Sequence, residues 1–127
     1  MKQILVIDRD DGSRRVIREL LENYGGFKVV DSANGAAAFQ QTQNRCQPVD
    51  LILTDTITPG KKAEKATQQL CDQFPQAPLI ALTDIRQDTA SAAYQHLAGN
   101  MKTNPTIVKP FHPSDFFHAI DDALQSQ

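Results

Sequence analysis

The chain has 127 residues, of which 40% are hydrophobic and 22% charged, a composition that suits one compact domain with its own core. Its 13 Lys and Arg residues against 15 Asp and Glu residues give a net charge of -2, which provides no field to attract phosphate backbones or anionic lipid. Nucleic acid and membrane are therefore not expected as direct partners. The first apolar run, Ile4–Ile7, is too short for a signal peptide or a membrane span, so a cytoplasmic location is expected.

The first half of the chain predicts two strands, each followed by a helix. A strand over 4–7 leads into a helix that Gly25 and Gly26 close. A second strand over 27–30 leads into a weakly patterned helix over 36–45, which Asn34 and Gly35 start. The apolar face predicted for the first helix consists of Val16, Ile17, Leu20, Leu21 and Tyr24.

The second half predicts three further strands and three further helices. Strands are expected over 51–54, 79–82 and 106–108, and helices over 63–74, 90–97 and 116–124. Ser114, just after Pro113, is expected to cap the last helix. Cys46 and Cys71 fall in predicted helices without ligand spacing, so neither a disulfide framework nor a zinc site is indicated.

The predicted strands are apolar runs without polar alternation, as in strands buried on both faces of a parallel sheet. Five strands that alternate with five helices predict a single α/β domain. Right-handed crossovers make this a flavodoxin-like (βα)5 doubly wound sheet with the strand order 2-1-3-4-5. In such a sheet the side chains just past the carboxyl ends of the strands form the ligand site.

The predicted strand ends bring together two carboxylates, a hydroxyl and an amine. Asp8, Asp55, Thr83 and Lys109 follow strands one, three, four and five. A carboxylate can accept a phosphoryl group, a second acid can hold a divalent metal, and a hydroxyl and an ammonium can bind phosphoryl oxygens. This set of side chains indicates a phosphoryl-transfer site.

At these residues the chain resembles the receiver domain of two-component response regulators. The match includes the acidic residue that ends the first strand, Asp55 four residues before Pro59, Thr83 after an apolar strand, and Lys109-Pro110-Phe111 before the last helix. The resemblance covers residues 1–127 as one receiver domain, with no output domain expected.

The resemblance implies a role for each site residue. Asp55 would be the phosphoacceptor, and Asp8, Asp55 and the backbone carbonyl of Ile57 would bind magnesium. Thr83 would be the hydroxyl that moves toward the phosphoryl group, and Lys109 the cation that contacts it. The phosphoryl donor would be a histidine kinase or a phosphotransfer protein, and the signal would pass to a downstream protein partner or an output domain. The domain would not be an enzyme beyond self-phosphorylation and self-dephosphorylation.

Three residues of the site depart from the family pattern. Arg9 replaces the second acid that normally ligates the metal, so magnesium binding is expected to be weak, with Asp10 as an alternative ligand. Asp84 replaces the small residue after Thr83 and should hinder phosphorylation. Thr106 replaces the aromatic switch residue, so the usual coupling of hydroxyl to aromatic ring cannot operate unchanged.

Two other functions remain open from the sequence. The first is a pseudo-receiver, which would have the same fold and act as a phosphorylation-independent interaction module. The second is a phosphohydrolase of the haloacid-dehalogenase type, with Asp8 as nucleophile and Asp10 as acid and base. That enzyme would leave the spacing of Asp55 and Pro59 unexplained.

Overall fold

A computed structural model describes residues 2–43, 48–55, 61–84, 107–109 and 111–125, with the backbone alone at 61–64, 83–84 and 108–109. The strands are β1 (Gln3–Ile7), β2 (Lys28–Ser32), β3 (Leu51–Asp55), β4 (Leu79–Asp84) and β5 (Ile107–Lys109). The helices are α1 (Asp11–Asn23), α2 (Gly35–Gln43), α3 (Lys61–Gln73) and α5 (Pro113–Gln125). The helix predicted over 90–97 and Cys46 lie outside the described residues.

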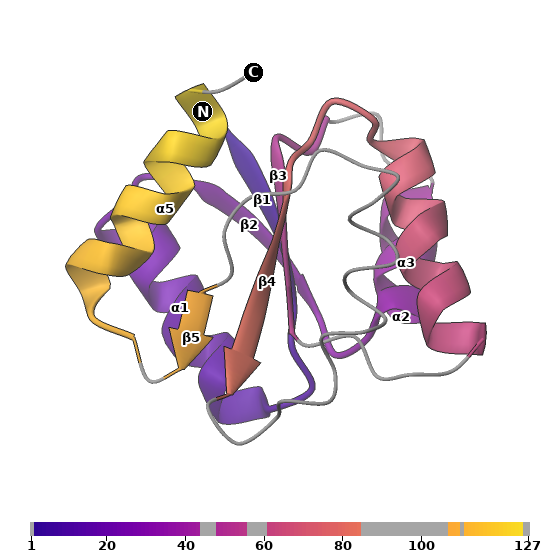
Figure 1. The fold of residues 1–127 in the computed structure, drawn as a ribbon, viewed down its shortest axis with the longest axis horizontal. Coiled ribbons are helices and arrows are strands. Elements are labelled where there is room, and N and C mark those ends of the chain that lie inside the picture. The colour runs from indigo at the N-terminus through magenta and orange to yellow at the C-terminus, as the bar shows by residue number, and fades with distance from the viewer. Residues whose placement is uncertain (1, 44–47, 56–60, 85–106, 110, 126–127) are drawn as a thin grey trace.

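The five strands form one parallel sheet in the order β2-β1-β3-β4-β5, which confirms the predicted topology (Figure 1). The register pairs Ile7 with Ser32 and with Thr54, and Asp55 with Leu82. The carboxyl ends of all five strands therefore lie along one edge of the sheet.

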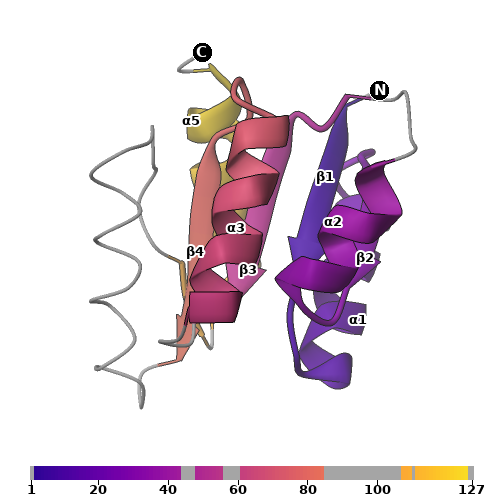
Figure 2. The same cartoon turned by 90° about the vertical axis from the view of Figure 1, so that its right-hand side faces the viewer.

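Helices cover both faces of the sheet, with α1 and α5 on one side and α2 and α3 on the other (Figures 1 and 2). Alternate residues of β1 and β3 point into two separate apolar clusters. Val6 and Leu53 pack with α1 and α5, whereas Leu5 and Ile52 pack with α2 and α3. The continuous apolar runs in the sequence thus supply two cores, one on each face.

Two sequence expectations about burial are wrong. The second strand begins at Lys28 rather than at residue 27, and it is only partly buried because β2 is an edge strand. On α1, Ile17 and Leu21 are fully buried, but Val16 is 53% exposed and Tyr24 is 81% exposed. Val16 lies about 100° around the helix from Ile17, and Tyr24 comes after the last helical residue.

The helix ends are held by local contacts. The Asn34 side chain accepts a hydrogen bond from the Ala37 amide at 2.8 Å, as expected for the cap of α2. The expectation that Ser114 caps α5 is wrong, because α5 begins at Pro113 and His112 occupies the cap position. The His112 carbonyl accepts from the Phe116 amide, and its ring nitrogen Nδ1 accepts from the Ser114 amide at 3.3 Å. Proline suits the first helical position because its missing N–H would be unpaired there in any case.

Candidate functional site

Asp8 lies at the carboxyl end of β1, where the strand turns into α1. Its side chain is buried, and its backbone N–H donates to the Ser32 carbonyl of the neighbouring strand at 3.1 Å. Its Oδ1 accepts a hydrogen bond from the Asp10 amide at 3.0 Å. Asp8 is thus a buried carboxylate that the turn after β1 holds in place.

Asp10 serves as the N-cap of α1. Its Oδ1 accepts from the Gly12 amide at 3.0 Å and from the Ser13 amide at 3.4 Å, which satisfies two backbone donors of the first helical turn. These contacts direct Asp10 toward the helix. They provide no support for Asp10 as an acid and base of a hydrolase, or as a replacement metal ligand.

Asp55 is the last residue of β3, and its side chain is 20% exposed. Its Oδ2 accepts a hydrogen bond from the backbone N–H of Arg9 at 3.1 Å, and the Nε atom of Arg9 lies 3.4 Å from the same oxygen. Arg9 therefore places both a backbone donor and a positive charge against the carboxylate that the sequence nominates as phosphoacceptor. The Arg9 side chain is 58% exposed, so solvent screens this ion pair.

The remaining site residues are described in part or not at all. The register places Thr83 opposite Val108 and Asp84 opposite Lys109, so all three site residues lie at the same sheet edge as Asp55. The side chains of Thr83, Asp84 and Lys109 are not among the described parts of the structure. Ile57 and Thr106 lie outside the described residues.

Magnesium fits the described part of this site poorly. Magnesium requires near-octahedral oxygen ligation and is usually bound through carboxylates. No group of three or more His, Cys, Asp or Glu side chains suited to a metal is present among the described residues. Among the acids whose side chains are described here, Asp8 and Asp55 are the candidate ligands, because Asp10 caps a helix. The Arg9 guanidinium lies against Asp55. A cation thus already lies against one of the two candidate ligands.

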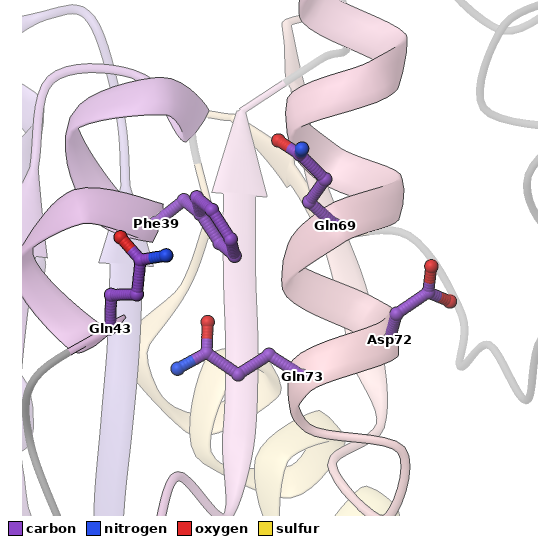
Figure 3. A pocket seen from close by; sticks show the side chains of 5 residues that line it. All are labelled: Phe39, Gln43, Gln69, Asp72 and Gln73. Atoms are coloured by element: carbon purple, nitrogen blue, oxygen red, sulfur yellow. The ribbon is translucent and has the colours of Figure 1, made fainter.

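A shallow groove of about 470 Å³ lies elsewhere, between α2 and α3 (Figure 3). It is lined by Phe39, Gln43, Gln69, Asp72 and Gln73. Since Gln43 and Gln73 end their helices, the groove lies toward the carboxyl ends of α2 and α3, away from the strand ends that hold Asp8 and Asp55. It is not part of the acidic site.

Sequence reasoning missed one residue beside the site. The Arg14 guanidinium donates to the backbone carbonyl of Asp8 at 2.7 Å and also binds Asp11 and Asp31. The contact with Asp11 could have been predicted from the sequence, because residues three apart on a helix lie side by side. The contact with Asp31 could not, because it depends on how β2 pairs with β1.

In a doubly wound sheet, ligands bind at the carboxyl ends of the strands, which is where Asp8 and Asp55 lie. The family model described as the response regulator receiver domain matches residues 4–121. The chain belongs to the response regulator receiver domain family. Members of this family are signalling domains that interact with histidine kinases, phosphotransfer proteins and output domains, and they commonly bind magnesium at an acidic pocket.

Relatives of similar length support this assignment. The chain is 27% identical over 124 residues to the response regulator receiver protein CpdR of Brucella abortus, with 98% of each chain covered. It is 27% identical over 123 residues to the chemotaxis protein CheY of Halobacterium salinarum, with 97% of each covered. A CheY-like receiver domain structure from Methanospirillum hungatei has the same fold, with a TM-score of 0.78 at 21% identity. The match covers 99% of this chain and 95% of the Methanospirillum chain. None of the helices in the described part of the chain is long and apolar enough to cross a membrane.

Proposed function

We propose that this receiver domain accepts a phosphoryl group on Asp55. The observation that carries the proposal is the position of Asp55 at the carboxyl end of β3, with a side chain that is partly open to solvent. Asp8, the acid that follows β1, is nearly inaccessible to a donor, with 2% of its surface exposed. Of these two acids, Asp55 is the one that a phosphoryl donor can reach.

The reaction would transfer the group from a histidine kinase or a phosphotransfer protein. A carboxylate oxygen of Asp55 attacks phosphorus, the phosphorus–nitrogen bond of the donor's phosphohistidine breaks, and the electron pair stays on the imidazole. The product is an acyl phosphate on Asp55. Lys109 would contact the phosphoryl oxygens with its ammonium group, Thr83 would supply a hydroxyl to them, and the change would pass to a downstream protein partner or an output domain.

A pseudo-receiver is the second candidate function, and the contact between Arg9 and Asp55 favours it. Arg9 places a cation 3.4 Å from the acceptor oxygen, which lowers the negative charge available for a divalent metal. A receiver with this arrangement could act as a docking module whose surface does not depend on phosphorylation.

Labelling with a small radioactive acyl phosphate distinguishes the two functions. The protein and its Asp55→Asn variant are incubated with the donor, with and without magnesium, and the bound label is counted after denaturation. We expect a label on the unaltered protein that is stable in acid and lost in alkali, and no label on the variant. A folded protein that takes no label in either condition would instead be a pseudo-receiver, and a label that persists in Asp55→Asn would overturn the assignment of Asp55.

A further inference from the structure

The Arg14 side chain links three segments around the site. Its Nη1 donates to the Asp8 carbonyl oxygen at 2.7 Å, its Nε lies 3.2 Å from Oδ2 of Asp31 on β2, and its Nη2 lies 2.6 Å from Oδ1 of Asp11 on α1. Only 18% of the Arg14 side chain is exposed, so these contacts are better shielded from solvent than a surface ion pair. The planar guanidinium can satisfy all three acceptors because its donors point in fixed directions.

The contact with Asp8 acts on the peptide group that faces Asp55. The carbonyl of Asp8 and the N–H of Arg9 belong to one peptide unit, which is planar and trans, so the two groups point in opposite directions. Arg14 binds the carbonyl at 2.7 Å, and the N–H donates to Oδ2 of Asp55 at 3.1 Å. Holding one end of this peptide unit therefore sets the direction of the other.

A charged donor bound to the carbonyl also makes the N–H on the far side of the same peptide unit a stronger hydrogen-bond donor. Hydrogen bonds in a chain polarise one another, and those made by a guanidinium are stronger than neutral ones. Arg14 donates both to Asp31 and to the Asp8 carbonyl. On the far side of the same peptide unit, the Arg9 N–H donates to Asp55. The edge strand β2 is thereby connected to the acidic site through a single side chain.

Arg18 provides a matched comparison within the same ion-pair cluster. It lies one helical turn after Arg14, binds the other oxygen of Asp31 at 2.7 Å and pairs with Glu22 at 3.0 Å. Its described contacts are with these two carboxylates and do not include the turn that holds Asp8. Loss of Arg18 removes an ion pair from Asp31 without touching the peptide unit at the site.

We propose that Arg14 is a positioning residue that orients the Asp8–Arg9 peptide group so that its N–H donates to Asp55. Part of the inference rests on the proposed function, since the same N–H would then donate to the acyl phosphate formed on Asp55. Its structural part concerns the resting site alone. The two parts are tested separately.

The first test measures hydrogen exchange at the Arg9 amide by NMR in the unaltered protein, Arg14→Ala and Arg18→Ala. The Leu53 amide in the central strand serves as the reference for global stability. In Arg14→Ala we expect Arg9 exchange to accelerate by about ten-fold relative to that reference, the size of one lost hydrogen bond. In Arg18→Ala we expect a change of less than about two-fold, because Arg18 does not touch the peptide unit.

Arg14→Lys keeps the charge and one donor, so it should recover part of the protection, and it also serves if Arg14→Ala does not fold. Equal Arg9 exchange in the Arg14 and Arg18 variants would overturn the proposal. So would full protection in Arg14→Ala.

The second test measures the rate of labelling by a small acyl phosphate as a function of donor concentration. The oriented N–H would donate to the phosphoryl group as it is transferred to Asp55 and would not contact the free donor. We therefore expect Arg14→Ala to lower the maximal rate by about ten-fold with little change in the half-saturating concentration. Arg18→Ala should label at the unaltered rate, and a matching loss in both variants would overturn the part of the inference that rests on the proposed function. If the unaltered protein takes no label, the proposed function fails, while the exchange result still decides whether Arg14 positions the peptide group.

Discussion

At the level of single residues, Arg9 adds a positive charge beside Asp55. Two strand-end carboxylates would together attract a divalent cation, but the guanidinium lies 3.4 Å from one of them. Two unit charges about 5 Å apart interact by roughly 3 kcal/mol at an effective dielectric constant of about 20, and exposure of Arg9 reduces this value further. The remaining repulsion is still large enough to change metal affinity measurably.

We therefore predict that Arg9→Asp binds magnesium at least ten-fold more tightly than the unaltered protein, a gain of about 1.4 kcal/mol or more. The substitution removes a cation and supplies an oxygen ligand of the kind that magnesium prefers. Calorimetric titration with magnesium measures the affinity, and Arg9→Gln separates loss of the cation from gain of the ligand. Equal affinities in all three proteins would show that Arg9 does not govern metal binding.

Cys71 illustrates how burial controls reactivity at one residue. It is a free cysteine on the inner face of α3, and burial, with a smaller contribution from Asp72, raises the pKa of its thiol to about 11. At pH 8 only about a thousandth of such a thiol is ionised, and the thiolate is the reactive form.

In a Cys46→Ser background, which leaves Cys71 as the single cysteine, we predict that alkylation at pH 8 is at least about 100-fold slower in the folded protein than in urea. The rate in the folded protein should rise as the pH approaches 11, since deprotonation is favoured there. Mass spectrometry follows the modification with time. A similar rate in folded and unfolded protein would show that Cys71 is accessible.

At the level of elements, the end of α1 depends on the backbone of one glycine. Gly26 has φ of +69°, and it lies within the turn in which the Gly25 amide donates to the Leu20 carbonyl and the Phe27 amide donates to the Leu21 carbonyl. This left-handed conformation allows the chain to leave the helix and enter β2 within a few residues. No heavy atom lies within 4 Å of a Cβ placed at Gly26, so space is not the constraint there.

Gly26→Ala should accordingly lower the free energy of unfolding by about 1 kcal/mol, through backbone strain alone. Gly26→Asn is the matched control, because asparagine tolerates the left-handed region better than alanine, and it should lose less. Urea denaturation followed by circular dichroism measures both variants. If Gly26→Ala is as stable as the unaltered protein, the turn does not need the positive φ.

At the level of the whole molecule, the position of a strand in the sheet decides how much its side chains contribute to stability. β3 lies in the middle of the sheet with both faces covered, and Leu53 is fully buried between α1 and α5. β2 lies at the edge, and Val29 is only partly buried against the same core. The two residues belong to one apolar cluster, but β3 has a strand on each side, β1 and β4, whereas β2 pairs with β1 alone.

We predict that Leu53→Ala lowers the free energy of unfolding by about 2–5 kcal/mol, through lost apolar burial and the cavity that remains. Val29→Ala should cost less than about 1.5 kcal/mol, since solvent and neighbouring side chains can fill the space at the edge. The midpoint of urea denaturation measures both effects. Equal losses in the two variants would mean that β2 is as firmly packed as β3.

Much of the fold was predictable because its signals are local. Each strand is marked by an apolar run of about four residues, and each helix by apolar residues at helical spacing. Both patterns lie within a short stretch of sequence, so they indicated five strands and the helices between them. The parallel order followed because right-handed crossovers leave few alternatives. Placing Asp8 and Asp55 at one edge needed only the rule that parallel strands end on the same side.

The tertiary structure decided what local patterns do not encode. Which strand lies at the edge determines that β2 is half-exposed, although its sequence resembles that of a buried strand. The contacts of Arg14 with Asp31 and of Arg9 with Asp55 span 17 and 46 residues, so they exist only after the strands have paired. The sequence by itself therefore determined the architecture and nominated the acidic residues. The packing of distant segments decided which cation lies against Asp55 and which side chain orients the peptide group beside it, because charges far apart in the chain interact only once folding brings them within a few ångströms.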